Sequence, residues 1–189
     1  MTTGNQLRFM GAFAAIAMAP DARADQLTLT EKPGHVTEAT VTVDATPAEV
    51  YAMVTDYAQW RTVFHDVISV SVKSGGRHDA KVRFKSQALQ HEVTVVFDNV
   101  PDQWVRFRGV EGPPGGRASG SYELTPVDDG KRTRVRAHLY MDVVGLPGLF
   151  IGDSKVRSMR EAKLRADMTD VMRRFSPPQA QVSAQSASG

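Results

Sequence analysis

Residues 43–60 read VDATPAEVYAMVTDYAQW, and this stretch contains the most complete set of local folding signals in the chain. Thr46 and Glu49 have the spacing of a capping box, in which each side chain bonds the other residue's backbone N–H. Pro47 suits the first helical position because its φ is already helical and the N–H that it lacks would have no partner there. The stretch therefore predicts a helix over 47–55. Its buried side is expected to consist of Val50, Met53 and Val54.

Patterns typical of strands flank this helix and a second short helix, which is expected over 57–63. Residues 36–43 come before the helices and alternate apolar residues with polar ones. Six later segments alternate in the same way, with mostly charged or polar residues at the opposite positions, which favours an antiparallel sheet with one wet face and one covered face. The six segments are 67–73, 80–86, 92–98, 104–108, 119–125 and 133–142.

After Gly148 the pattern changes to a helical period and keeps it to Phe175. A helix of this length would span about 42 Å at about 1.5 Å per residue, enough to cross a whole sheet. Its apolar residues form two groups, so ordinary packing and the closing of a cavity are both consistent with the pattern. The smaller group is Val156, Met159, Ala162 and Ala166, and the bulkier group is Leu164, Met168, Val171 and Phe175.

The order of strand, two short helices, six strands and long helix resembles the helix-grip fold of the START and Bet v 1-like (SRPBCC) superfamily. The stretch 43–60 is similar to that family's opening motif. Residues 120–126, 130–139 and Leu146-Pro147 before the long helix are similar to its closing half. Within the superfamily, the chain most resembles the polyketide cyclase/dehydrase and coenzyme Q-binding (COQ10-like) START group. The resemblance implies an α+β fold, with a curved antiparallel sheet of about seven strands around a long C-terminal helix.

The resemblance also implies a deep apolar tunnel between the sheet and the long helix. Members of the superfamily bind sterols, lipids, quinones, plant hormones or polyketides, and some are cyclases, so the fold leaves the ligand open. The alternative is that the same side chains simply fill the interior. The residues expected to line the tunnel are Val82, Phe84, Val95, Phe97, Val105, Phe107, Tyr122, Leu124, Ala137, Leu139 and Met141 from the sheet, with Met159, Ala162 and Ala166 from the helix.

The composition excludes several classes of protein. The 189-residue chain is 41% hydrophobic and 23% charged, which favours one globular domain with a sizeable core. Lys and Arg number 23 against 21 Asp and Glu without a block of like charge, so we expect no nucleic-acid partner. The absence of cysteine excludes disulfides, thiol catalysis and cysteine-ligated metal sites.

The N-terminus is typical of an export signal. Arg8 precedes an apolar run over 9–19, and Ala22-Arg23-Ala24 has the A-x-A pattern of a cleavage site. The run is shorter than the roughly 20 residues that span a bilayer. We therefore expect a signal peptide over 1–24, cleaved after Ala24, and a periplasmic or secreted protein. An uncleaved anchor and a buried N-terminal helix are the alternatives.

The rest of the chain is expected to form three parts. Residues 25–34 are polar and close with Pro33-Gly34, which indicates a linker. Residues 35–175 form the helix-grip domain. Residues 176–189 are rich in Pro, Gln, Ser and Ala without periodicity, which indicates a disordered tail.

No residue is proposed to do covalent chemistry, and no cofactor is expected. No G-x-S-x-G motif of a serine hydrolase occurs. Asp56, within the opening motif, is expected to cap or brace the two short helices. The histidines lack the spacing of a metal site, so none is predicted. They are His35, His65, His78, His91 and His138.

Two further features allow a plain and a functional interpretation. The glycine-rich stretch 109–120 is either a mobile hairpin loop or a gate over the tunnel, where Arg117 and Tyr122 could contact a ligand's polar head group. The last helix is basic, which indicates either a solvated surface or transient contact with an anionic membrane surface. Its basic residues are Lys155, Arg157, Arg160, Lys163, Arg165, Arg173 and Arg174.

The sequence therefore predicts an exported, monomeric protein that binds a hydrophobic small molecule, which could be a lipid or a sterol-like, quinone or polyketide-like compound, and carries or shields it. Enzymatic activity stays open, although no catalytic set is evident. One alternative is an aromatase/cyclase-like enzyme that uses the same tunnel, with Tyr122 as the one inward acid or base. Another is a domain with a filled core that acts through its basic helix.

Overall fold

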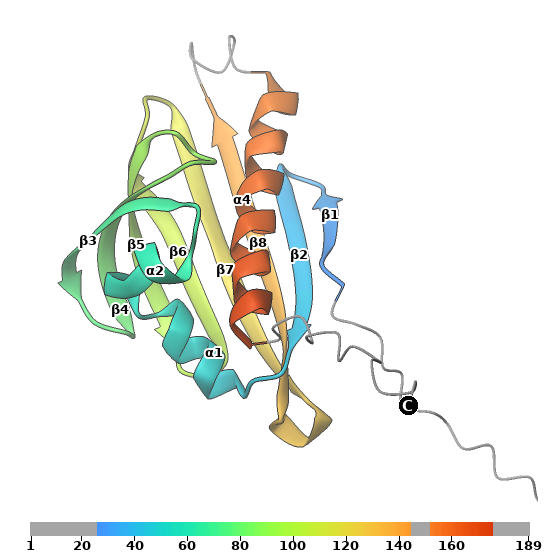
Figure 1. Ribbon diagram of the computed structural model, residues 1–189. Helices are drawn as coiled ribbons and strands as arrows, with labels where there is room; N and C mark the ends of the chain where they lie inside the picture. The colour runs from blue at the N-terminus through green and yellow to red at the C-terminus, as the bar shows by residue number, and fades with distance from the viewer. Residues whose placement is uncertain (1–25, 145–151, 176–189) are drawn as a thin grey trace, which may run out of the picture.

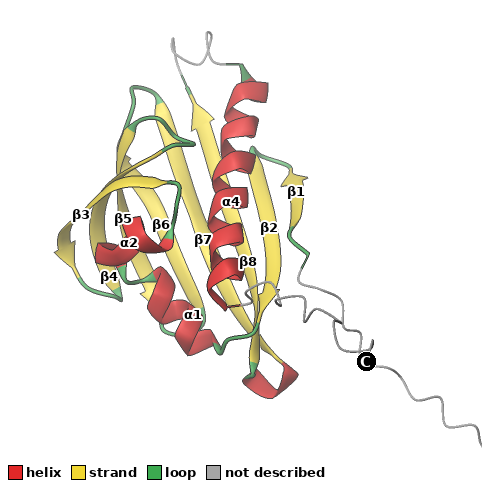
Figure 2. Cartoon of the chain, viewed as in Figure 1, coloured by secondary structure: helices red, strands yellow, loops and turns green. Residues whose placement is uncertain are grey.

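In the computed structural model, which describes residues 26–144 and 152–175, an antiparallel sheet curves around a long helix (Figure 1). Its eight strands follow the order β1-β2-β8-β7-β6-β5-β4-β3. Helices α1, α2 and α4 lie on one face of the sheet (Figure 2). The helix-grip architecture is confirmed. The strands are β1 (Thr28–Lys32), β2 (Val36–Val43), β3 (Val67–Gly75), β4 (Asp79–Ser86), β5 (Glu92–Val100), β6 (Trp104–Glu111), β7 (Gly116–Val127) and β8 (Arg132–Val143), and the helices are α1 (Pro47–Val54), η1 (Tyr57–Gln59), α2 (Trp60–Val63), η2 (Asp128–Gly130) and α4 (Asp153–Phe175).

Helix α1 begins as the capping signals predict. The backbone N–H of Glu49 donates to Thr46 Oγ1 at 3.3 Å, and the N–H of Thr46 donates to Glu49 Oε2 at 2.8 Å. The apolar side of the helix packs on β6, β7 and β8. Asp56 precedes η1, but its side chain makes no capping hydrogen bond, so the predicted cap is wrong.

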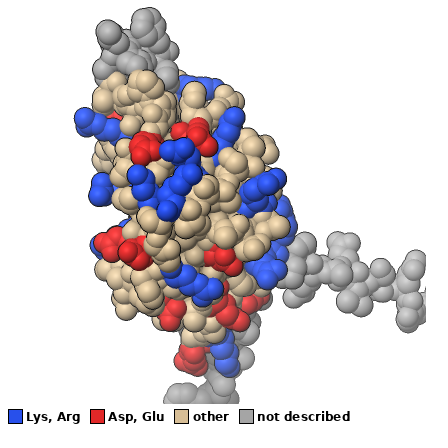
Figure 3. Space-filling model, turned by 90° about the vertical axis from the view of Figure 1, so that its left-hand side faces the viewer, with Lys and Arg blue, Asp and Glu red and all other residues tan. Residues whose placement is uncertain are grey.

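The sheet alternates between a covered inner face and a wet outer face. Along β2, residues at every second position are buried, and the same alternation runs along β8. The outer positions carry charged side chains of both signs, and these lie interspersed on the side of the molecule where β3 is found (Figure 3). Tight turns join β3 to β4 after Gly75 and β7 to β8 at Asp128–Gly130.

Strand β1 is an addition to the expected fold. It lies in the segment 25–34, which the sequence predicts as a linker, and it pairs with β2 along its whole length. Pro33-Gly34 is therefore the turn of a hairpin, with Gly34 at φ +80°, and the linker prediction is wrong for residues 28–32. The pairing satisfies the backbone groups along the outer edge of β2, which would otherwise be open.

Helix α4 begins at Asp153 and ends at Phe175. The start of the helical pattern, directly after Gly148, lies outside the described residues. Its buried side differs from both predicted groups, because charged residues take inward positions. Ala162 is exposed and Ala166 is half-buried, so the predicted small-residue side is wrong for these two alanines, whereas Val156 of the same group is buried. The basic side is also smaller than predicted, since Arg160 is 2% exposed. The buried residues are Val156, Arg160, Leu164, Asp167, Met168, Asp170 and Val171.

The predicted signal peptide over 1–24 and the predicted tail over 176–189 lie outside the described residues. Within the described ranges, no helix is long and apolar enough to cross a membrane.

Candidate functional site

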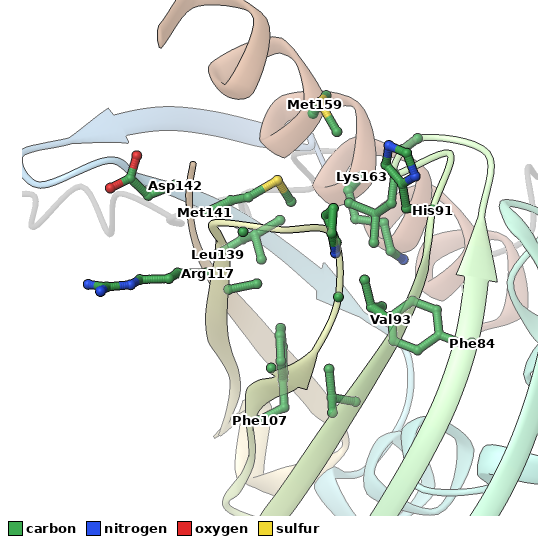
Figure 4. Close-up of a pocket in the computed structure, with 18 of the residues that line it drawn as sticks. Phe84, His91, Val93, Phe107, Arg117, Leu139, Met141, Asp142, Met159 and Lys163 are labelled. Carbon is green, nitrogen blue, oxygen red and sulfur yellow. The ribbon is translucent and has the colours of Figure 1, made fainter. Parts of the chain in front are cut away.

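A cavity of about 370 Å³ lies between the first half of α4 and the inner face of the sheet (Figure 4). Strands β4 to β8 supply its floor and walls, and α4 covers it. The β4–β5 turn and the β6–β7 hairpin contribute exposed residues, including His91 and Pro114, so the cavity opens at this end of the sheet. The volume is within the range of small-molecule sites.

The lining is mostly apolar and agrees in part with the sequence prediction. Eight of the fourteen residues predicted to line the tunnel do line the cavity, because their alternation along the strands identifies the inner-face positions. In Figure 4, side chains from the sheet and from α4 converge on the same space. The eight are Phe84, Val95, Phe97, Phe107, Tyr122, Leu139, Met141 and Met159.

The other six predicted residues do not line the cavity. Four of them are buried on the inner face but belong to the packed core, because the cavity occupies only part of that face. Ala162 is exposed and Ala166 is half-buried on α4, which corrects the predicted helix side. The four core residues are Val82, Val105, Leu124 and Ala137.

An aromatic cluster forms the inner wall. The Trp60 ring stands edge-on to Phe84 and Phe97, with centroids 5.5 and 5.7 Å apart, and Phe97 is 5.9 Å from Phe107. Trp60 Nε1 donates to the carbonyl oxygen of Val54 at 2.9 Å, which fixes the ring and satisfies its polar atom. Sequence reasoning placed Trp60 in the opening motif but not in the site.

The glycine-rich stretch 109–120 is mainly strand, so its prediction as a loop is wrong. Only residues 112–115 connect β6 to β7. Gly120 lies inside β7, where a Cβ atom would come within 2.4 Å of the His138 carbonyl oxygen and 2.6 Å of Phe107 Cζ. A glycine in a strand marks such a close approach, and here it allows the Phe107 ring to lie against the sheet.

Three polar side chains meet on the wall of the cavity. Tyr122 donates its hydroxyl to Asp167 Oδ2 at 2.9 Å, and Lys163 donates to Asp167 Oδ1. Burial raises the pKa of the Asp167 carboxyl, and contact with Lys163 opposes that shift. Burial, and next the charge of Asp167, raises the pKa of Tyr122 well above its usual value. Tyr122 is therefore neutral, and its one O–H donor is used on Asp167.

Lys163 and Asp167 were missed in the sequence because charged residues on a helix usually face water. Only their spacing of four residues, which suits an ion pair on one side of a helix, indicated a connection. Arg117, predicted to approach the ligand head group, is exposed and extends away from the apolar side chains in Figure 4.

The described ranges contain no cluster of three or more potential metal ligands. Three histidines instead have protein partners. His65 Nδ1 is 2.6 Å from Asp170 Oδ2, and His138 Nε2 is 2.9 Å from Glu38 Oε2. His78 Nδ1 lies 3.3 Å from the Tyr51 hydroxyl.

Solved structures share this architecture. Protein TTHA0849 from Thermus thermophilus superposes with a TM-score of 0.61 at 19% identity, over 74% of this chain and 95% of the other. A START superfamily protein from Mycobacterium smegmatis has a TM-score of 0.60 at 14% identity, over 75% and 97%. The Zhui aromatase/cyclase from Streptomyces sp. R1128 has a TM-score of 0.57 at 21% identity, over 77% and 98%. Identities this low establish the shared fold alone.

Sequence comparison gives the family. No curated protein matches the chain. The family model described as polyketide cyclase / dehydrase and lipid transport matches residues 34–176, which extend from the start of β2 to the end of α4. The chain therefore belongs to the polyketide cyclase/dehydrase and lipid transport family and has the START and Bet v 1-like fold.

Proposed function

We propose that this protein binds one apolar small molecule in the cavity beneath α4 and carries or shields it. The observation that supports this most is the continuous apolar lining from the aromatic wall to Met159 on the helix. A ligand that buries about 200 Å² of apolar surface would gain about 5 kcal/mol from the hydrophobic effect. That gain must exceed the cost of association.

The cavity volume limits the size of the ligand. About 370 Å³ is near the low end for small-molecule sites. A compact ring system or a short acyl chain therefore fits better than a whole two-chain lipid. The β4–β5 turn and the β6–β7 hairpin border the opening, so a ligand would enter and leave the cavity at this end of the sheet.

An aromatase/cyclase-like activity is the second candidate. Asp167 supports it, since a buried carboxylate with a raised pKa on a cavity wall is the kind of group that accepts a proton. Tyr122 already donates to that carboxylate. Conversion of a poly-β-ketone substrate to a cyclised product would favour this activity over a carrier role, and recovery of the compound unchanged would favour the carrier.

The test is native mass spectrometry of the gently purified protein, followed by organic extraction. We expect a co-purifying apolar adduct, or uptake of the neutral probe N-phenyl-1-naphthylamine by the empty protein. Phe107→Asp and Leu139→Asp place a charge in the lining and should abolish retention. Val72→Asp is the control, because Val72 is 41% exposed and outside the cavity.

If both lining variants fold, as judged by circular dichroism, and retain ligand as the control does, the proposed site is wrong. A wild-type protein that holds no adduct and takes up no probe after exposure to membrane lipid extract would overturn the carrier proposal itself.

We further propose export as a monomer, on the signal pattern in the sequence. The intact mass of protein expressed with export should correspond to cleavage after Ala24, and the protein should fractionate with the periplasm or the medium. Retention of the N-terminal residues in the cytoplasm would overturn the proposal. A mass under native conditions that corresponds to two chains would overturn the monomer.

A further inference from the structure

The wall of the cavity contains a lysine between two buried carboxylates. Lys163 and Asp167 are one turn apart on α4, and both line the cavity. Asp66 precedes β3 and lies behind them, outside the lining. Asp66 is 4% exposed and Asp167 is 3% exposed, so water screens neither carboxylate well.

The hydrogen bonds of this cluster are incomplete. Asp66 Oδ1 accepts from the backbone N–H of Ala88 at 2.9 Å, but Asp66 Oδ2 is buried and accepts no hydrogen bond from the described residues. That oxygen is 3.6 Å from Lys163 Nζ. An ammonium has three N–H donors, and within the described ranges Lys163 uses one of them, on Asp167. The cluster therefore has donor capacity left next to the cavity.

The charges of the cluster are also unbalanced. Two carboxylates and one ammonium leave one negative charge when all three are ionised. The raised pKa of Asp167, caused first by burial and in smaller part by Asp66, is consistent with this excess. Other charged groups around the cavity offer little compensation. Lys155 is exposed at its opening, the Glu111 carboxylate is paired with Lys81 and Arg83, and the side chains of Arg117 and Asp142 extend away from the apolar side chains (Figure 4).

We propose that this cluster recognises a neutral oxygen group, a hydroxyl or a ketone carbonyl, on an otherwise apolar ligand, and that it discriminates against carboxylates. The ligand oxygen accepts a hydrogen bond from Lys163, and a ligand hydroxyl also donates to Asp167. An anionic group would bring a further uncompensated charge into a site that water does not screen. This inference names the ligand class for the proposed function and rests on it.

The test compares three ligands that share one ring system. Naphthalene, 2-naphthol and 2-naphthoate are titrated at pH 7 as competitors of N-phenyl-1-naphthylamine. We expect 2-naphthol to bind about tenfold more tightly than naphthalene, as one hydrogen bond to a charged group provides. We expect 2-naphthoate to bind at least tenfold more weakly than 2-naphthol.

Variants assign the selectivity to the cluster. Asp66→Asn removes one negative charge from behind the lining and should bring the affinity for 2-naphthoate up about tenfold relative to 2-naphthol. Asp167→Asn should do the same, and Lys163→Met should weaken the preference for 2-naphthol over naphthalene, because only the hydrogen bond from the hydroxyl to Asp167 then remains. Arg165→Met is the control, since Arg165 is exposed on the same helix and outside the cavity. It should leave both ratios unchanged.

Failure of this inference is distinguishable from failure of the proposed function. If neither naphthalene nor the neutral probe binds, the cavity is not a site for apolar ligands and both fail. If both bind but 2-naphthoate competes as well as 2-naphthol, or Asp66→Asn and Asp167→Asn leave the ratio unchanged, the ligand class is wrong and the apolar site stands.

Discussion

The inner face of the sheet has two regions that look alike in sequence and differ in structure. Beneath α1 and η1 it is filled, with Val50 and Val105 fully buried and the Tyr57 ring 4.5 Å from that of Phe97. Beneath the first half of α4 it encloses the cavity. Strands supply apolar residues at every second position to both regions. What differs is the covering helix: the buried residues of α1 are all apolar or aromatic, whereas α4 adds Lys163 and Asp167 to its apolar residues over the cavity.

The two halves of helix α4 are held in place differently. Its second half is packed, with Met168 and Val171 at 0% exposed. Its first half is tied at the side away from the cavity, where Arg160 donates to Thr37 Oγ1 at 3.1 Å and to the Met141 carbonyl oxygen at 3.0 Å, and pairs with Glu31 of β1. The hydrogen bonds and the ion pair of Arg160 thus hold the first half of α4 in place, where the cavity reduces its apolar contacts with the sheet.

The largest expected effect is on stability, and it should differ between two methionines of α4, one in the packed half of the helix and one over the cavity. Met168→Ala removes a fully buried side chain outside the cavity and should lower the free energy of unfolding by about 2–5 kcal/mol. Met159→Ala enlarges an existing cavity at a partly exposed position and should cost less than about 1 kcal/mol while weakening probe binding. Urea denaturation measures both. Equal losses for the two variants would contradict the distinction between filled and hollow regions.

Loss of the Arg160 hydrogen bonds should have an intermediate effect on the free energy of unfolding. Arg160→Met keeps the stem but loses its hydrogen bonds, at a cost of about 2 kcal/mol in the free energy of unfolding. The first half of α4 should then open more readily, so N-phenyl-1-naphthylamine should dissociate faster in stopped-flow measurements. Arg157→Met is the matched control, because Arg157 is exposed and its pair with Glu161 contributes little. A dissociation rate equal to that of the control would show that these hydrogen bonds do not restrain the helix.

The fold followed from local patterns because strands alternate and α1 has explicit capping signals. The lining of the cavity could be predicted from these patterns only in part. Alternation separates the inner face from the outer face, but it contains no information about which helix covers each position, so Val105 and Phe107 looked equivalent. Only the tertiary structure places Val105 in the filled region and Phe107 in the cavity wall.

The errors on α4 and β1 also have a physical cause. Arg160 and Asp167 are polar and were therefore assigned to water, yet each is buried with partners from distant segments, Glu31 and Tyr122. Pairs so far apart in sequence leave no local pattern. The β1 segment is polar because it forms an edge strand with half-exposed side chains, which the sequence pattern did not distinguish from a linker.

The smallest expected effect is on the outer face of the sheet behind the cavity, where Glu111 joins β6 to β4 and β5. Its carboxylate accepts hydrogen bonds from Lys81 Nζ at 3.0 Å and Thr94 Oγ1 at 2.9 Å, and Arg83 donates a third at 3.2 Å. The bond from Lys81 first, and then the other two, lower the pKa of this carboxyl from 4.5 to about 2. Because the folded-state pKa is the lower one, the stabilisation is complete above pH 4.5 and is lost as the pH falls through about 2.

Glu111→Gln should therefore be slightly less stable than wild type at pH 7. In urea denaturation this difference in the free energy of unfolding should shrink between pH 4.5 and 2. Added salt should shrink it too, because the group is exposed. A difference that stays constant across this pH range would mean that the ionised carboxylate does not tie these strands, and that the wall behind the cavity depends on the backbone pairing alone.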